Sequence, residues 1–328
     1  MQQMIEAICK GKKGVRLTIG TYANGEKQVK VFDETGEIQN AHYTYEIGSI
    51  TKTFTAALLA KCVHEGKLSL DDSIGKYLGL DSEKYYPTLK RLATHTAGYS
   101  MHLPFGILSG IKAYLAVNSG KSPFILSLEK MKKLVQKNKL TDKDYPHEYS
   151  NFGFGLLGYA IGVATGKGYW DAMDEFLSKD MGMKNSYTGT QPGKNLRGFN
   201  KSGRDVGNWE WNKDLTSPAG DISSTAEDLL DYAKINIDGE KPYLAMCYQK
   251  HADIKIKGRV IAGQGLGWVL YPENNFALIN HTGQTGAFVT DLCIDRVKKC
   301  ASVALINYRM PPRDMLLLNR TVLKSLQG

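Results

Sequence analysis

Ser49 and Lys52, three residues apart, are the side chains of this sequence whose types and spacing could do chemistry together. Residues at this spacing share one face of a helix, so the lysine amine would project beside the serine hydroxyl. A serine hydroxyl is a weak nucleophile without an adjacent base, and a desolvated lysine with a lowered pKa can be that base. The pair predicts nucleophilic catalysis at Ser49. Taken alone, such a pair is more often a helix cap followed by a lysine that reaches solvent.

The residues that follow Ser49 have the composition of a buried helix. The segment 51–64 contains no glycine or proline and is apolar on nearly every side, and Gly66 follows it as a helix-ending residue. A helix that is apolar all round lies in a protein core. We therefore expect Ser49 at the N-terminal end of a central helix, where the helix dipole is positive.

The composition is that of a globular protein. The chain has 328 residues, of which 42% are hydrophobic and 23% are charged, enough for one large domain or two. No apolar run is long enough to span a membrane, and the N-terminus lacks the basic start and apolar block of a secretion signal. We expect no membrane span. The location is predicted as cytoplasmic if Met1 is the native start and otherwise as extracytoplasmic with the signal removed; the sequence leaves the oligomeric state open.

The net charge of +9 has a local source. Seven lysines lie between positions 121 and 143, with apolar residues interleaved at helical spacing. This pattern predicts one amphipathic helix with a solvated basic face, and no aromatic stacking pattern accompanies it. We therefore expect no nucleic-acid binding.

Two other patterns do not support a cofactor or a metal. The five cysteines are irregularly spaced and form no Cys-x-x-Cys pair, so zinc ribbons and redox pairs are not predicted. The run from Gly153 to Gly158 is a literal G-x-G-x-x-G, but a proline-broken polar loop precedes it and no β-α-β unit surrounds it. We interpret Gly155, Gly158 and Gly162 as positions of close helix packing.

The remaining patterns place strands at both ends of the chain and helices in the middle. Alternating runs predict a hairpin of strands 15–19 and 28–32 around Asn24-Gly25, and an antiparallel meander of strands 267–271, 276–280, 287–294 and 302–306. The first forty residues are predicted to hold only strands and turns. A capping box from Ser224 to Glu227 predicts a helix at 228–235, and an amphipathic helix is predicted at 313–326.

These elements together predict an α+β fold with one antiparallel sheet flanked by helices. The sheet domain would be built from residues 1–75 and 215–328, and residues 76–214 would form an inserted, mainly helical domain.

Three motifs occur in order along the chain: Ser49-Ile50-Thr51-Lys52, Tyr149-Ser150-Asn151 and His281-Thr282-Gly283. They resemble those of the serine penicillin-recognising hydrolases, the family that includes class C β-lactamases and D-alanyl-D-alanine carboxypeptidases. In that family the third motif is Lys-Thr-Gly in β-lactamases and His-Thr-Gly in a subset of peptidases and esterases. The likeness extends to the connecting segments 91–99, 149–166, 217–229 and 283–288, so it spans most of the chain.

The resemblance implies an active site between the sheet domain and the helical domain. Ser49 would attack an acyl carbonyl, and Lys52 and Tyr149 would share the proton transfers. A tyrosine can act as a base only where nearby cations favour the phenolate; otherwise it relays a proton. His95, which could also be considered as a base, is interpreted as structural because nothing near it in sequence completes a relay.

The resemblance also implies a set of substrate-binding residues. Asn151 would position the substrate amide, and His281, Thr282 and Gly283 would line the sheet side of the cleft. The backbone N–H groups of Ser49 and Gln284 would hold the oxyanion, as paired donors do in acyl-transfer enzymes.

The predicted function is that of a serine acyl hydrolase working through an acyl-enzyme on Ser49: a D-amino-acid peptidase or carboxypeptidase, an amidase or an esterase. The substrate would be a small molecule or a peptide, with β-lactams as acylating ligands. Because His281 is mostly neutral at pH 7, it holds a substrate carboxylate less well than lysine, which lowers the expectation of an efficient β-lactamase. Two alternatives stay open: a true class C-like β-lactamase and a non-catalytic penicillin-binding or sensor module.

Overall fold

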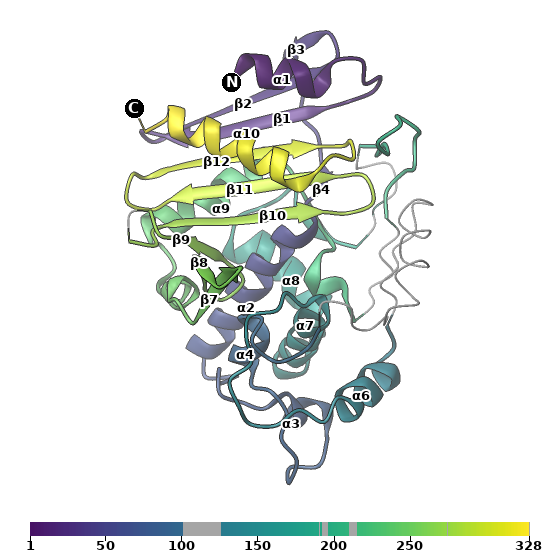
Figure 1. The fold of residues 1–328 in the computed structure, drawn as a ribbon, viewed down its shortest axis with the longest axis vertical. Helices are drawn as coiled ribbons and strands as arrows, with labels where there is room; N and C mark the ends of the chain where they lie inside the picture. Colours follow the sequence, from purple (N-terminus) through teal and green to yellow (C-terminus); the bar gives the residue numbers. More distant parts are fainter. Residues whose placement is uncertain (101–125, 190, 192–195, 210–214, 274, 328) are drawn as a thin grey trace.

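The computed structural model describes residues 1–100, 126–189, 191, 196–209, 215–273 and 275–327. Its main feature is a nine-stranded antiparallel sheet with the strand order β3-β2-β1-β12-β11-β10-β9-β8-β7 (Figure 1). The strands are β1 (Leu17–Ala23), β2 (Glu26–Asp33), β3 (Gly36–Ile38), β7 (Ala252–Ile256), β8 (Arg259–Gln264), β9 (Val269–Tyr271), β10 (Leu278–Gln284), β11 (Val289–Asp295) and β12 (Cys300–Ile306).

The N-terminal and C-terminal parts of the chain meet inside this sheet, as predicted. Strand β1 pairs with β12 in a register that places Leu17 opposite Ile306. The hairpin between β1 and β2 turns at Asn24 and Gly25, whose φ angles of 53° and 82° are those that a two-residue hairpin turn requires. Strands β9 to β12 are neighbours in sequence order, which confirms the predicted meander.

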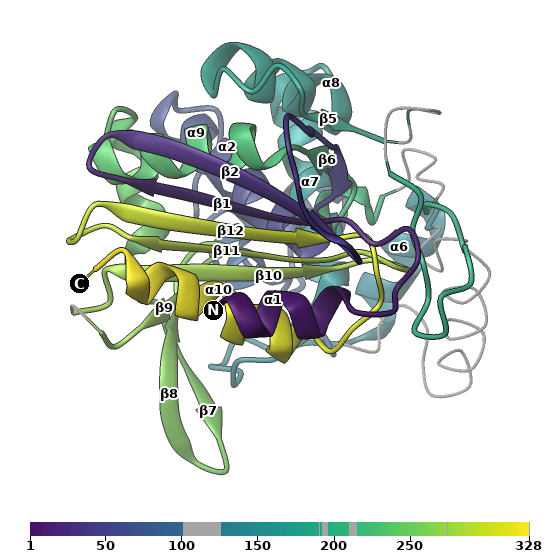
Figure 2. The same ribbon diagram turned by 90° about the horizontal axis from the view of Figure 1, so that it is seen from above.

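Helices cover both faces of the sheet and extend beyond it. Helices α1 and α10 lie on one face, and α2 and α9 lie on the other (Figure 2). The antiparallel sheet flanked by helices confirms the predicted fold class. The helices are α1 (Gln2–Cys9), α2 (Thr51–His64), α3 (Ile74–Leu78), α4 (Leu89–Ala93), α6 (Leu128–Lys137), α7 (Asn151–Thr165), α8 (Tyr169–Glu175), α9 (Ala226–Asp238) and α10 (Pro312–Ser325).

A small second sheet connects the segments around the predicted site. It has the order β4-β6-β5, from β4 (Tyr45–Glu46), β6 (Ile222–Ser224) and β5 (Tyr187–Thr188). Strand β5 belongs to the predicted inserted segment, but it pairs with β6 outside that segment. The division of the chain into residues 1–75 plus 215–328 and residues 76–214 stays a prediction.

Helix α2 runs through the core as predicted. Its residues from Thr51 to Ala60 are all buried, and Gly66 follows the helix with φ 71°. Helix α6 carries the basic face that the lysine pattern predicted, with Met131 and Val135 on its buried side. Lys121 of the same pattern lies outside the described residues.

Two predictions for secondary structure were wrong in detail, and one hairpin was missed. The first forty residues are not only strands and turns, because α1 is a helix that buries Ile5 and Cys9. The β7–β8 hairpin, which projects from the sheet in Figure 2, was not predicted. Helix α9 is capped by Thr225, whose side chain accepts the N–H of Asp228, so the cap lies one residue after the predicted Ser224.

Gly155, Gly158 and Gly162 of α7 pack closely against neighbouring segments, which confirms the packing interpretation of these glycines. A Cβ atom at Gly155 would lie 2.4 Å from the carbonyl oxygen of Leu215, and one at Gly158 would lie 2.1 Å from Pro218 Cγ. Real Cβ atoms do not approach other atoms so closely. The G-x-G-x-x-G run lies within a helix, and no strand precedes it directly, so it is not a dinucleotide fingerprint.

Gly158→Ala should therefore destabilise the protein. We expect a decrease of about 1–3 kcal/mol in the free energy of unfolding, the usual cost of overpacking a core. Gly153→Ala is the matched control in the same helix, because the nearest atom to its added Cβ is 3.6 Å away. That control should be neutral or should stabilise the helix by up to about 1 kcal/mol. Urea unfolding measures both, and equal effects would contradict the packing account.

Three further observations concern the cysteines, possible metal sites and possible membrane spans. All five cysteines are buried free thiols. Within the described residues, no group of three or more His, Cys, Asp or Glu side chains could hold a metal ion. None of the helices described here is long and apolar enough to cross a membrane.

Candidate active site

Ser49 lies on a short helical turn, Gly48–Ile50, that leads from β4 directly into α2. Strand β10 crosses beside this turn. Gly48 has φ 54°, and a Cβ there would lie 2.6 Å from the backbone nitrogen of Gln284. Both the backbone conformation and the close approach require glycine at this position. The turn is also tied to β11, because the Thr290 hydroxyl donates to the carbonyl of Ile47 at 2.8 Å.

Lys52 is fully buried one turn into α2. Its Nζ lies 3.0 Å from Ser49 Oγ and 2.7 Å from the carbonyl oxygen of Ala219. It also lies 4.8 Å from the ring centroid of Tyr149 and 5.6 Å from that of Phe154. Burial lowers the pKa of Lys52 well below its usual value, because desolvation penalises the charged form. A neutral amine can take a proton from Ser49.

Tyr149 reaches the same point from the start of α7. Ser150 caps this helix, with its hydroxyl accepting the N–H of Gly153 at 3.1 Å, so Tyr149 lies just outside the first turn. Ser49 lies near the Tyr149 hydroxyl and acts to lower its pKa. Burial raises the pKa of Tyr149 above its usual value despite this effect. The hydroxyl therefore keeps its proton at neutral pH, which favours the relay over the phenolate base.

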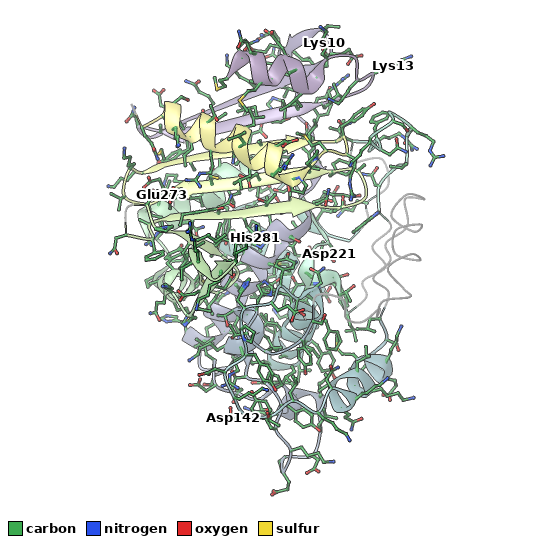
Figure 3. The ribbon with its side chains drawn as sticks, in the orientation of Figure 1. Lys10, Lys13, Asp142, Asp221, Glu273 and His281 are labelled. Carbon is green, nitrogen blue, oxygen red and sulfur yellow. The ribbon has the colours of Figure 1, made fainter. Side chains whose placement is uncertain are left out.

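His281 lies in β10 on the side that faces α2 (Figure 3). Its ring centroid is 6.4 Å from that of Tyr149, and its Nδ1 is 2.9 Å from the carbonyl oxygen of Thr282. Burial and the nearby Lys52 amine lower the pKa of His281 to about 3. The imidazole is therefore neutral at neutral pH.

The other residues of the third motif occupy different positions around β10. The Thr282 hydroxyl donates to Asp291 at 2.7 Å, and Asp291 in turn accepts from Asn319 of α10 at 2.8 Å. Thr282 can thus offer a ligand only an acceptor. A Cβ at Gly283 would lie 1.9 Å from the carbonyl oxygen of Ile47, so glycine is required for β10 to pack on the Ser49 turn.

The two remaining predicted residues lie at the edges of the site. The Gln284 backbone nitrogen is close to Gly48, as the 2.6 Å approach shows, so its amide lies beside the Ser49 turn. Asn151 is the first residue of α7 and is partly exposed, two residues after Tyr149. The roles of both residues stay predictions.

Sequence reasoning missed three groups near Ser49. The Ala219 carbonyl that accepts from Lys52 belongs to the turn Ser217–Ala219, where the Pro218-Ala219-Gly220 run is the one visible signal. The ring of Phe154 covers Lys52 but looks in sequence like any helix residue. Glu46 is buried and accepts the N–H of Trp209 at 2.7 Å. Burial raises the pKa of Glu46 to about 7.

The neutral state of His281 should make the protein less stable in mild acid. The pKa of His281 is about 3 in the folded chain, against 6.5 for an exposed histidine. Between these values the unfolded chain binds a proton that the folded chain does not, so the free energy of unfolding falls as the pH falls, by up to about 1.4 kcal/mol per pH unit. Glu46 contributes with the opposite sign, because its pKa is raised.

His281→Asn should remove the histidine contribution and leave that of Glu46 unchanged. Urea unfolding of both proteins between about pH 7 and 5 gives the free energy of unfolding as a function of pH. The histidine contribution is the difference between the two slopes. The variant should lose less stability than the parent over this range. Parallel curves would contradict a neutral His281.

Known proteins are similar to this chain in sequence. A model of the family described as Beta-lactamase matches residues 7–327. A beta-lactamase of Lysobacter lactamgenus is 27% identical over 335 residues, covering 88% of this chain and 80% of the relative. The D-alanyl-D-alanine-carboxypeptidase/endopeptidase AmpH of Escherichia coli (strain K12) is 25% identical over 280 residues, covering 79% and 70%.

Solved structures share the fold. A class C beta-lactamase superposes with a TM-score of 0.81 at 21% identity, covering 100% of this chain and 95% of the other. The octameric penicillin-binding protein homologue from Pyrococcus abyssi superposes with a TM-score of 0.75 at 24% identity, covering 94% and 73%.

Proposed function

Because the chain belongs to the Beta-lactamase family, whose members are serine hydrolases, we propose that Ser49 is the nucleophile and forms an acyl-enzyme. The family match confirms the resemblance predicted from the three motifs. The observation that carries the proposal is the 3.0 Å separation between Ser49 Oγ and the Nζ of a buried lysine. A serine hydroxyl beside an amine with a lowered pKa is an activated nucleophile.

The proposed reaction begins with proton transfer from Ser49 Oγ to the neutral Lys52 amine as Oγ attacks the acyl carbonyl. The backbone N–H groups of Ser49 and Gln284 would hold the oxyanion, each worth about 3–4 kcal/mol of transition-state stabilisation. The Tyr149 hydroxyl would then protonate the leaving group as its bond to the acyl carbon breaks, and Lys52 would return the proton to Tyr149. Water would release the acyl group from Ser49 by the reverse sequence.

The neutral state of His281 affects which substrates the site would prefer. A cleft with an uncharged side chain at this position lacks the fixed cation that would hold a carboxylate there. We therefore propose amides, peptides or esters of small molecules as better substrates than cephalosporins. Because beta-lactamases are among the relatives, we also propose β-lactams as acylating ligands.

Labelling at Ser49 tests the proposal. The protein would be incubated with a fluorophosphonate and, separately, with a fluorescent penicillin, and the modified peptide would be located by mass spectrometry. We expect an adduct on Ser49 that Ser49→Ala abolishes. The absence of an adduct with both probes would contradict the proposal.

A substrate panel separates hydrolysis from simple binding. D-Ala-D-Ala peptides, short p-nitrophenyl esters and a chromogenic cephalosporin would be assayed, again with Ser49→Ala as the control. Turnover of an ester or peptide supports the hydrolase, and rapid turnover of the cephalosporin would identify a true β-lactamase. Labelling without turnover of any substrate would identify a penicillin-binding or sensor module.

His281→Lys should shift the preference toward substrates that carry a carboxylate. A cation at this position would favour a carboxylate by about 1.4 kcal/mol, which is a tenfold change in rate. We expect kcat/KM for the cephalosporin to rise about tenfold relative to a neutral p-nitrophenyl ester. His64→Lys is the control, because it adds the same charge at the exposed end of α2. No change in the ratio would show that substrates do not place a carboxylate near His281.

A further inference from the structure

His95 occupies a loop after α4 and is only 3% exposed. Its backbone has φ 57°, in the left-handed region that residues other than glycine seldom adopt. Such a conformation persists where the surrounding contacts fix it, and it is often found near functional sites. We therefore expect the contacts of His95 to hold this backbone conformation.

Two hydrogen bonds join His95 to the residues on either side of Tyr149. The His95 carbonyl accepts the N–H of Glu148 at 2.8 Å, and the imidazole Nδ1 accepts the N–H of Ser150 at 3.1 Å. The His95 ring also lies against the Tyr149 ring, with centroids 4.5 Å apart and planes inclined by 36°. It also lies near the Phe154 ring, with centroids 5.1 Å apart.

Tyr149 needs such support because it precedes the first turn of α7. The helix begins at Asn151, and the hydroxyl of its cap residue, Ser150, is already used on the N–H of Gly153. The helix therefore does not fix the backbone at Tyr149. One histidine fixes it from both sides and packs on its ring as well.

We propose that His95 is a positioning residue that holds the Tyr149 hydroxyl at Ser49 by accepting the Ser150 N–H and packing on the phenol ring. His95 itself does not transfer protons to the substrate. Nδ1 must be unprotonated to accept, so the ring proton lies on Nε2. Burial together with Lys52, His147 and His281 lowers the pKa of His95, which keeps this form. The inference rests on the proposed function, since it assigns Tyr149 a role in catalysis.

Two variants separate the hydrogen bond from the backbone conformation. His95→Asn places an amide oxygen near the position of Nδ1 and tolerates a positive φ, whereas His95→Gly tolerates the φ but offers no acceptor. On an amide substrate, we expect kcat to fall about 30-fold in the glycine variant with KM changed less than about threefold, and asparagine should recover most of the loss. Endpoint titration of Ser49 with a fluorophosphonate counts the folded enzyme in each sample.

A double-mutant cycle with Tyr149→Phe provides the decisive readout. If His95 acts through Tyr149, then His95→Gly should lower kcat by less than about twofold when the Tyr149 hydroxyl is already absent. Independent, multiplicative losses would show that His95 supports only the fold and would overturn the inference. A loss in Tyr149→Phe without any loss in His95→Gly would overturn it too and leave the proposed function standing. If Tyr149→Phe itself were fully active, the proposed role of Tyr149 would be wrong, and the inference about His95 would be overturned with it.

Discussion

Lys52→Met should reduce kcat/KM for esters and amides by about 10³-fold, because a positioned general base contributes about 10²–10⁴-fold. Methionine matches the length of lysine but has no basic nitrogen. Ser49 would keep its place at the start of α2 and lose the amine now 3.0 Å away. Steady-state kinetics with a p-nitrophenyl ester, together with the rate of Ser49 labelling, measures the effect.

The same variant should lack the pH-dependent loss of stability that Lys52 causes. The pKa of Lys52 is far below its usual value in the folded chain, so the unfolded chain binds a proton that the folded chain does not. The free energy of unfolding therefore falls as the pH drops below about 10.4, by up to about 1.4 kcal/mol per unit until the folded pKa is reached. Methionine removes this penalty. It also leaves the Ala219 carbonyl without its donor, at a cost of about 1–3 kcal/mol.

Lys61→Met is the matched control in the same helix. Lys61 is an ion-pairing residue, with Asp180 at 2.8 Å and Glu65 at 3.6 Å, and it lies away from Ser49 near the end of α2. Its loss should leave turnover unchanged and cost at most about 1 kcal/mol of stability. If Lys52→Met kept more than about a tenth of the parent activity, a base other than Lys52 would have to activate Ser49.

The parts of the fold that could be predicted are those where burial follows the sequence pattern. Helix α2 is apolar on nearly every side and is buried from Thr51 to Ala60, and strands β11 and β12 are buried along their whole length. The β7–β8 hairpin alternates as well and turns at Gly258, but Ile256 and Val260 are 57% and 48% exposed. The apolar residues of this hairpin therefore do not belong to the core, and the hairpin was not predicted.

The site could be predicted only where it is encoded in short motifs. The spacing of Ser49 and Lys52 on one helix face is local, and the structure shows the contact at 3.0 Å. The partners supplied by the tertiary fold have no such signal. The carbonyl of Ala219 is a backbone group 167 residues from Lys52, and the N–H of Ser150 reaches His95 across 55 residues. Any residue type can supply a backbone donor or acceptor, so sequence alone does not reveal these contacts.

Tyr149→Phe should slow hydrolysis of an amide by about 10³-fold and that of a p-nitrophenyl ester by about tenfold or less. The phenol keeps its proton because burial raises its pKa, and it lies near Ser49. An amine leaves only when its nitrogen is protonated, whereas p-nitrophenolate leaves as a stable anion. Loss of a proton donor therefore affects the amide far more than the activated ester.

Phenylalanine keeps the ring that packs on His95 and lies near Lys52, so the variant tests the hydroxyl alone. Tyr145→Phe is the control, because Tyr145 lies four residues earlier and its hydroxyl accepts the N–H of Thr141 at 3.0 Å. That control should leave both rates unchanged. Equal losses on the amide and the ester in Tyr149→Phe would contradict the donor role, since deprotonation of Ser49 is the step that the two substrates share. Tyr149 would then act with Lys52 in activating the nucleophile, and the raised pKa of the phenol would have to be lowered when substrate binds.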